Sequence, residues 1–268
     1  MAPPSRRRAL GQHFLREPAI ARAIVDLVAP TPDDVVVEIG PGEGALTAEV
    51  VRRAPGRLLA LDVDPALVAR LRGRFPAARF PGLDVVEADA RRWDYGRLVA
   101  PPGGRVLVVG NLPYSVSKPI VAALVGAHGS ITEMALMLQL EVAQRLAARP
   151  GGKTYASVSV LTQLYCDVRI AFHVPPGAFR PPPKVESGVV HLASRPEPRV
   201  PVADARRFQV VVRAAFAQRR KMLANALAGG LGIAADTVRR VAEDVGIDPG
   251  RRAETLEIEE FARLAARL

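Results

Sequence analysis

The sequence is poor in several residue types that mark particular classes of protein. A single cysteine, Cys166, excludes an intrachain disulfide. With one cysteine and four scattered histidines, no spacing indicates a zinc site. No stretch approaches the roughly 20 apolar residues of a membrane-spanning helix, and no apolar signal-peptide segment follows the basic N-terminus. We therefore expect a soluble, cytoplasmic protein that binds neither metal nor membrane.

Lysine is also scarce, yet the chain is strongly basic. Only Lys118, Lys153, Lys184 and Lys221 are lysines, and the rest of the 37 basic residues are arginines. A GC-rich genome would explain arginine over lysine, but not the excess of basic over acidic residues that gives a formal net charge of +10. The charge favours an anionic partner, with nucleic acid ahead of membrane.

Short apolar runs alternate with helical patterns over the first two thirds of the chain. We expect strands at 35–40, 57–64, 84–89, 105–110 and 134–140, with helices at 45–54, 65–75 and 141–149. This alternation predicts right-handed βαβ units and a parallel sheet, hence an α/β fold. Two more strands are expected at 166–174 and 187–194, on either side of a proline-rich loop.

The pattern changes after the proline-containing linker at 195–205. Beyond it the apolar residues follow helical spacing, as in Phe208, Val211, Val212 and Ala215. The sequence predicts an α/β domain over residues 1–197 and a small all-helical domain over 198–268.

Three glycines lie in the turn after the first strand, EIGPGEGALT. Gly40, Gly42 and Gly44 would let the backbone pass close to a ligand before a helix begins. Their spacing is not that of the G-x-G-x-x-G dinucleotide fingerprint, and no G-x-x-x-x-G-K-[ST] phosphate-binding loop occurs. Taken alone, the turn is equally consistent with a tight strand-to-helix connection.

Carboxylates end the next two strands. Asp62 closes the second strand and Asp89 the third, and in a doubly wound sheet these ends meet beside the first turn. Asp62 could accept both hydroxyls of a ribose, and Asp89 the exocyclic amine of an adenine. A pocket for a nucleoside in a chain without a phosphate-binding loop indicates S-adenosylmethionine as the cofactor rather than ATP or NAD.

The fourth strand ends in GNLPYSVSKP. A turn needs Asn or Gly and sometimes Pro, but it does not need the aromatic residue that follows here. An adenine N6 amine is a poor nucleophile because its lone pair is delocalised, and two acceptors aimed at its hydrogens would localise that pair. Asn111 can supply a side-chain oxygen, and the stretch Leu112–Pro113 a main-chain carbonyl held by proline's fixed φ. Tyr114 can stack on the base, with the ring rather than the hydroxyl holding it. The alternative is an Asn-Pro turn with Tyr114 packed inward.

In these motifs the chain resembles the KsgA/RsmA family of small-subunit rRNA adenine dimethyltransferases, nearly from end to end. GQHFL, VEIGPGEGALT, LDVD, EADA and GNLPY occur in the family's order. FRPPPKVESGVV resembles its loop with a second stacking aromatic, here Phe179. FAQRRKMLANAL and VGIDPGRRAETLEIEEFARLA resemble its C-terminal helical domain.

The resemblance implies a Rossmann-like class I S-adenosylmethionine-dependent methyltransferase domain and a helical rRNA-binding domain. The partner would be 16S rRNA in the small ribosomal subunit or its precursor. The substrate would be two adjacent adenosines near its 3′ end, each converted to N6,N6-dimethyladenosine, by an enzyme that we expect to be a monomer. The implied cofactor-binding residues are His13, Leu15, Gly40, Asp62, Asp89 and Asn111, and the implied catalytic residues are Asn111, Pro113, Tyr114 and Phe179. His13 stands where the family usually has Asn, and Asp62 where it usually has Glu.

Three basic clusters are expected to contact RNA phosphates. Arg219, Arg220 and Lys221 lie at the start of a predicted helix in the C-terminal domain. The clusters Arg6–Arg8 and Arg251–Arg252 would add further contacts.

Three other functions stay open at this stage. The 23S rRNA adenine N6-methyltransferases of the macrolide-resistance type share the N-terminal motifs, but their C-terminal parts do not usually look like GIDPGRRAETL. A NAD-dependent oxidoreductase would explain the glycine turn and Asp62 but not NLPY or the positive charge. A non-catalytic cofactor-binding assembly or transcription factor would not need the intact set of Asp62, Asp89, Asn111 and Tyr114.

Overall fold

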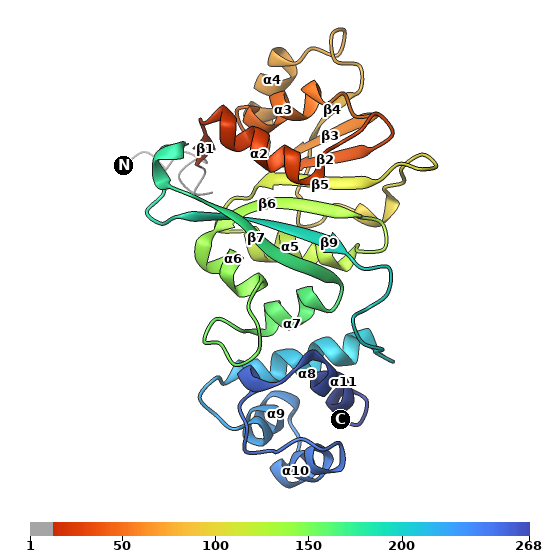
Figure 1. Ribbon diagram of the computed structural model, residues 1–268, viewed down its shortest axis with the longest axis vertical. Helices are drawn as coiled ribbons and strands as arrows, with labels where there is room; N and C mark the ends of the chain where they lie inside the picture. Colours follow the sequence, from red (N-terminus) through yellow and green to blue (C-terminus); the bar gives the residue numbers. More distant parts are fainter. Residues whose placement is uncertain (1–12) are drawn as a thin grey trace. The chain divides into compact units, whose positions relative to one another are not determined.

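The computed structural model describes residues 13–268, which form two compact units (Figure 1). Within the described residues, the first unit comprises 13–143 and Cys166–Ser194. The second comprises Gln144–Tyr165 and Arg195–Leu268. None of the helices in the described part of the chain is long and apolar enough to cross a membrane.

The first unit is built on a seven-stranded sheet in the order β4-β3-β2-β5-β6-β9-β7. Its strands are β2 (Val35–Ile39), β3 (Arg57–Asp62), β4 (Leu83–Glu87), β5 (Val106–Asn111), β6 (Glu133–Gln139), β7 (Cys166–Val174) and β9 (Ser187–Ser194). The first five pair in parallel, which confirms the expected βαβ region. The last two predicted strands are antiparallel to their neighbours, because β7 and β9 form a hairpin and β9 inserts beside β6.

Helices α2, α3 and α4 cover one face of this sheet (Figure 1). The helices of the first part of the chain are α2 (Pro18–Val28), α3 (Ala45–Arg52), α4 (Pro65–Arg74), α5 (Ser117–Gly126) and α6 (Leu140–Leu146), with short 3₁₀ turns at Tyr95–Arg97 and Pro176–Ala178. Val25 and Val50 from the helices pack in one core with Val36 and Leu107 from the sheet. Helices α2 and α5 were not expected from the sequence, although both bury a continuous apolar stripe.

A two-stranded ribbon fastens the N-terminal segment to the loop between β7 and β9. Strand β1 (Phe14–Leu15) pairs antiparallel with β8 (Phe179–Arg180), so that Leu15 lies opposite Phe179. This pairing brings His13 near the ends of the parallel strands.

The second unit is helical around its own core. Its helices are α7 (Ser157–Gln163), α8 (Ala205–Ala217), α9 (Leu223–Leu231), α10 (Ala235–Asp244) and α11 (Ile258–Ala265), with a 3₁₀ turn at Ala253–Thr255. The predicted apolar face of α8 is buried there, including Phe208, Val211 and Val212.

The helical unit is larger than the predicted range 198–268, and its C-terminal part already begins at Arg195. The segment Gln144–Tyr165, which lies between β6 and β7 in the sequence, also belongs to it. Tyr155, Val160 and Leu164 from this segment are fully buried in the helical core. The first domain is therefore discontinuous along the chain, because burial of these side chains draws the insertion away from the sheet.

Candidate functional site

The carboxyl ends of the parallel strands surround one cavity in the first unit. The turns after β2, β3, β4 and β5 line it, together with β1 and the start of α5. All the predicted cofactor-binding residues line it, as do three of the four predicted catalytic residues, with Asn111 belonging to both sets: His13, Leu15, Gly40, Asp62, Asp89, Asn111, Pro113 and Tyr114. Brändén's rule places ligands of doubly wound sheets at such an edge.

The glycine turn lies against the backbone of neighbouring elements. Gly40 has a φ of 66°, and a Cβ there would lie 3.3 Å from the Asn111 carbonyl oxygen. Gly42 has a φ of 55°, and a Cβ there would lie 2.9 Å from the Phe14 ring. Both positions therefore require glycine on conformational and steric grounds.

Asp62 is a nearly buried carboxylate at the end of β3, with 5% of the residue exposed. Its oxygens accept from the Asp64 N–H at 3.0 Å and the Gly42 N–H at 3.4 Å. Burial raises the pKa of the Asp62 carboxyl, and these main-chain donors oppose that effect. The side chain is thus fixed at the cavity and ties the end of β3 to the glycine turn.

Asp89 lies in the turn after β4 and is held by Arg91. The Arg91 guanidinium donates to both carboxylate oxygens, at distances of 2.6 to 3.1 Å, and its main-chain N–H donates to one of them at 2.9 Å. The hydrogen bond from Arg91 lowers the pKa of the Asp89 carboxyl. Asp89 is therefore an ionised acceptor in a defined orientation at the cavity.

The amide of Asn111 is oriented by the main chain of His13. Asn111 Nδ2 donates to the His13 carbonyl oxygen at 2.8 Å, which fixes the orientation of the amide. The His13 ring makes different contacts: Nδ1 lies 2.8 Å from the Pro181 carbonyl oxygen, and the ring centroid lies 5.3 Å from that of Tyr114. His13 therefore acts on Asn111 through its backbone, which does not depend on the identity of its side chain.

Pro113 follows Asn111 in a short turn. Its carbonyl oxygen accepts from the Val116 N–H at 3.1 Å, and its Cδ would lie 3.7 Å from a Cβ on Gly40. The Leu112 N–H donates to the Met137 carbonyl at 3.1 Å, so the turn is attached to β6. Because proline also restricts the residue before it, the Leu112 carbonyl is held in one direction.

Tyr114 is half-buried beside the cavity, and its hydroxyl has a specific partner. Tyr114 Oη lies 2.6 Å from Ser187 Oγ, on a residue of β9 that is fully buried. Burial raises the pKa of the Tyr114 hydroxyl, with the Ser187 contact opposing that effect. Ser187 was not expected to belong to the site, since 73 positions separate it from Tyr114.

Phe179 does not lie at the cavity. Only 4% of the residue is exposed, and its side chain packs in the core of the first unit with residues of the sheet and its helices. Its backbone pairs with Leu15, so it helps to hold β1 in place. Of the two predicted stacking aromatics, Tyr114 lies at the cavity and Phe179 does not.

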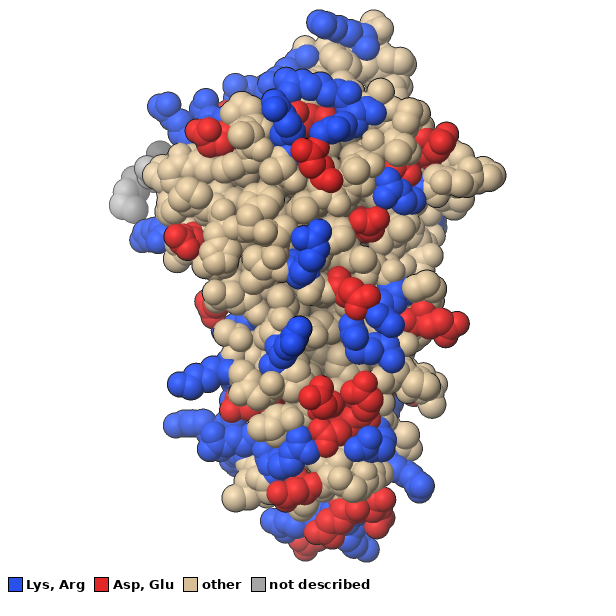
Figure 2. All heavy atoms as spheres, in the orientation of Figure 1, with Lys and Arg blue, Asp and Glu red and all other residues tan. Residues whose placement is uncertain are grey.

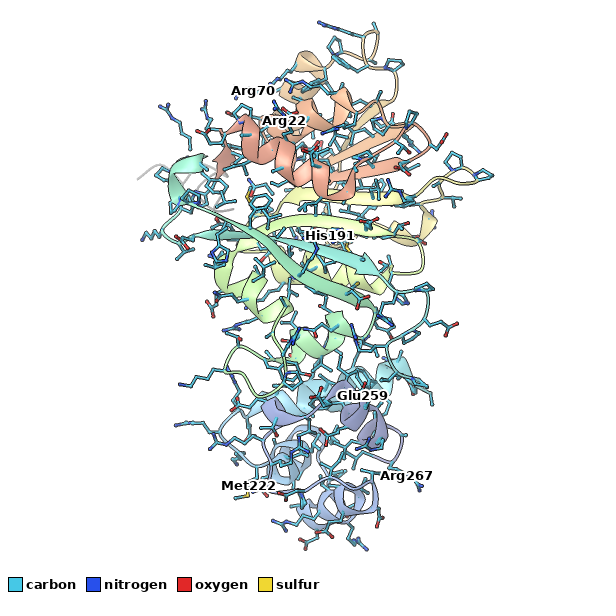
Figure 3. All side chains as sticks on the ribbon, viewed as in Figure 1. Arg22, Arg70, His191, Met222, Glu259 and Arg267 are labelled. Carbon is cyan, nitrogen blue, oxygen red and sulfur yellow. The ribbon has the colours of Figure 1, made fainter. Side chains whose placement is uncertain are left out.

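Two further acidic residues line the cavity without having been expected there. Glu43 forms ion pairs with Arg70 at 3.1 Å and with Arg16 at 3.8 Å; Arg70 is labelled in Figure 3. Glu38 lies inside β2 and is fully buried. A carboxylate within the apolar run VVVEI was the signal in the sequence that could have identified it.

The predicted RNA-binding cluster lies in the second unit. Arg219, Arg220 and Lys221 are exposed in the connection between α8 and α9, just before α9 rather than within its first turn. Arg219 also donates to the Lys153 carbonyl at 2.5 Å and pairs with Glu254 at 3.2 Å. Figure 2 shows basic and acidic side chains interspersed on the visible surface of this unit, so the cluster is a local feature.

The other two basic clusters differ from it. Arg251 forms an ion pair with Glu260 at 2.6 Å and donates to the Thr255 carbonyl at 2.6 Å, so it holds the C-terminal turn together. Arg252 is exposed. Arg6–Arg8 lie outside the described residues.

Comparison with known proteins gives a match over nearly the whole chain. Residues 4–268 match the family model "Ribosomal RNA adenine dimethylase". The chain is 44% identical to a "Ribosomal RNA small subunit methyltransferase A" of Geobacter sulfurreducens, covering 96% of this chain and 93% of that protein. It is 45% identical to the protein of the same name from Magnetococcus marinus, covering 96% and 90%.

Solved structures give the same fold. A dimethyladenosine transferase from Plasmodium falciparum superposes with a TM-score of 0.79 at 22% identity, covering 94% of this chain and 96% of that one. The 23S rRNA methyltransferase ErmE superposes with a TM-score of 0.70 at 27% identity, covering 95% and 99%. These matches confirm the predicted Rossmann-like sheet followed by C-terminal helices.

Proposed function

The chain belongs to the ribosomal RNA adenine dimethylase family, and on that premise we propose how its cavity and its helical unit take part in the reaction. It is an S-adenosylmethionine-dependent enzyme that dimethylates adenine in 16S rRNA. The substrate that we propose is the N6 amines of two adjacent adenosines near the 3′ end of that rRNA. The observation that carries the assignment of residues is the amide of Asn111, locked by His13 at the cavity that also holds Asp62.

The cavity fits a cationic nucleoside cofactor. The glycine turn forms one wall, where Gly42 packs against the Phe14 ring too closely for a Cβ. Asp62 and Asp89 line the same cavity as hydrogen-bond acceptors, and the chain has no phosphate-binding loop. We assign Asp62 to the ribose hydroxyls and Asp89 to the adenine amine, with His13, Leu15 and Gly40 completing the walls. When bound, the cofactor supplies a methyl group on a positively charged sulfur.

Asn111 is the first acceptor for the target amine. Because Nδ2 is committed to the His13 carbonyl, Oδ1 is the atom that remains to accept a hydrogen of the target amine. An acceptor fixed before the substrate arrives loses little entropy on binding, and such preorganised polar contacts contribute strongly to catalysis.

The second acceptor is a main-chain carbonyl of the same turn. The Pro113 carbonyl already accepts from the Val116 N–H, so we assign this role to the Leu112 carbonyl and give Pro113 the role of fixing it. Two acceptors on the amine would localise the nitrogen lone pair for attack. The methylated amine is acidic and can release its proton to water, so no strong general base is needed.

Tyr114 is the residue that we propose to stack on the target base. Its ring lies at the cavity and is held by the His13 ring on one side and the Ser187 hydroxyl at its tip. Stacking of this kind is worth about 1–3 kcal/mol per base. The Phe179 side chain is buried in the core of the first unit, so Tyr114 is the one of the two predicted aromatics that we assign to the base.

The helical unit is proposed to contact rRNA through Arg219, Arg220 and Lys221. Exposed basic side chains position a nucleic acid through its phosphates, whereas the cavity selects the atom that reacts. We further propose that the protein acts as a monomer in the cytoplasm, where assembling small subunits are found.

The small-subunit assignment is favoured over a 23S rRNA activity by the identities. Small-subunit methyltransferases reach 45% identity over nearly the whole chain, compared with 27% for ErmE. The decisive assay transfers labelled methyl groups to small subunits that lack the modification, with large subunits as the control. Labelling of the small-subunit rRNA alone supports the proposal, and labelling of 23S rRNA or of neither would refute it.

A further inference from the structure

Glu38 is a fully buried acid that the proposed chemistry does not use. It lies in β2, in the sequence VVVEI, and its residue exposure is 0%. It is nevertheless among the residues that line the cavity in which the cofactor is proposed to bind, and both of its carboxylate oxygens are shielded from solvent. A buried carboxylate is costly unless a counter-charge or hydrogen-bond donors compensate for it.

Among residues 13–268, Glu38 has no paired cation and no hydrogen bond of proper geometry. Neither Glu38 oxygen has a hydrogen-bond partner, and the hydroxyl of Thr47 on α3 is likewise buried without one. The residues opposite Glu38 in the sheet are Ala60 on β3 and Val109 on β5, which carry no charge.

The charged groups around the cavity further disfavour the ionised form of Glu38. Asp62, at the end of β3, acts on it as a like charge. Of the other cavity groups, Asp89 is paired with Arg91. Glu43 is paired with Arg16 and Arg70, so these cations are directed to other carboxylates.

These surroundings favour the neutral form of Glu38 in the free protein. Burial and, more weakly, the Asp62 charge raise the pKa of Glu38 to about 7, although the nearby Thr47 favours the charged form. The contacts between Thr47 and Glu38 do not reach hydrogen-bond geometry. The effect of burial on the pKa of Glu38 therefore outweighs that of Thr47.

We propose that Glu38 is a further cofactor-binding residue that releases its proton to solvent when the cationic cofactor binds, leaving a carboxylate as the cofactor's buried counter-charge. Only the O–H bond of the acid breaks, and water or buffer takes the proton. The inference rests on the proposed identity of the cavity as the S-adenosylmethionine site.

Proton release has a direct calorimetric signature. S-adenosylmethionine is titrated into the full-length protein in two buffers of different ionisation enthalpy. The difference between the two observed heats gives the number of protons that binding releases. If the pKa of free Glu38 is about 7, binding should release about half a proton at pH 7, more at pH 6, and about a tenth of a proton at pH 8. The affinity should accordingly weaken as the pH falls from 8 to 6.

Two amide variants assign the released proton. Glu38→Gln should bind the cofactor more weakly and release no proton between pH 6 and 8. Asp89→Asn removes a cavity carboxylate whose pKa Arg91 lowers, so it should weaken binding and leave proton release unchanged. A wild-type protein that binds without releasing a proton, or a Glu38→Gln variant that releases as many as the wild type, would overturn the inference about Glu38 alone. A complete absence of cofactor binding would overturn the assignment of the cavity as well.

A stability measurement shows whether Glu38→Gln is folded. Because the pKa of Glu38 is raised from its ordinary value of 4.5, the unfolded chain loses this proton at lower pH than the folded one, and stability falls as the pH rises through that interval. The cofactor-free Glu38→Gln protein should therefore have a higher Tm than the wild type at pH 8 and a similar Tm near pH 4.5. A lower Tm at pH 8 would show that Glu38 is ionised and compensated in the free protein, and would contradict the inference.

Discussion

Tyr114 and Ser187 are joined through their hydroxyl groups at 2.6 Å, which ties the tyrosine of the NLPY turn to β9, the strand between β6 and β7. Ser187 lies between Gln139 on β6 and Val174 on β7 in the strand register, and it is fully buried. The tip of the Tyr114 ring is thus fixed by a rigid element. The sequence alone suggested that the ring holds the base without help from the hydroxyl.

Removing either hydroxyl should therefore slow methyl transfer. A hydrogen bond of this kind contributes about 0.5–1.5 kcal/mol, so Ser187→Ala and Tyr114→Phe should each lower kcat roughly 2- to 10-fold with little change in cofactor Kd. Because both changes remove the same contact, the double variant should be no slower than either one. Ser187→Thr, which keeps a hydroxyl, should retain more activity than Ser187→Ala.

Steady-state kinetics with undermethylated small subunits measures these effects. Ser194→Ala makes the same substitution at the other end of β9 and serves as the control. Additive losses for Ser187→Ala and Tyr114→Phe would mean that the two hydroxyls act independently.

Asp62→Ala should weaken cofactor binding more than any other single change at the rim of the cavity. Loss of hydrogen bonds to a charged acceptor costs about 1.5–3 kcal/mol, which is a roughly 10- to 100-fold higher Kd. Calorimetry on the purified protein measures the Kd for S-adenosylmethionine. Asp84→Ala, an exposed carboxylate on β4 paired with Arg57, should leave the Kd unchanged. Equal affinities for Asp62→Ala and the wild type would remove Asp62 from the site.

Changing Arg219, Arg220 and Lys221 together to Ala should weaken rRNA binding and reduce its salt dependence. Each lost phosphate contact should lower the slope of log K against log salt by about 0.7–0.9. Arg219 is partly committed to Glu254, so its share should be the smallest. Changing the exposed Arg239, Arg240 and Arg267 to Ala removes the same three positive charges elsewhere in this unit and serves as the control. A slope that stays at the wild-type value would mean that the cluster does not contact RNA.

The sequence predicted those features that follow from strand order and failed for those that depend on side-chain packing. Gly40, Asp62, Asp89 and Asn111 lie at or just after the ends of successive strands. Parallel strands present these ends at one edge, so their meeting in one cavity was predictable. The Ser187 contact joins the fourth parallel strand's turn to a distant hairpin, and no local pattern encodes it.

Burial explains the other differences. Phe179 was expected at the cavity, but its ring is placed in the core by the β1–β8 ribbon. The sequence placed Tyr155 and Leu164 in the first domain, whereas the structure buries both in the core of the helical unit. Glu38 was visible as a charge in an apolar strand, but only the structure shows that it lacks a partner.

The account's central claim is that Asn111 is a fixed acceptor for an adenine amine that is methylated twice, and counting methyl groups tests it most directly. Mass spectrometry of digested 16S rRNA, after reaction with wild-type enzyme and with Asn111→Ala, reports the number of methyls per adenosine over time. The account predicts two methyls on each target adenosine with the wild type. It predicts that Asn111→Ala slows both transfers by about 10²–10³, as loss of one preorganised polar contact does. A wild-type reaction that stops at monomethyladenosine, or an Asn111→Ala variant that dimethylates at the wild-type rate, would contradict it.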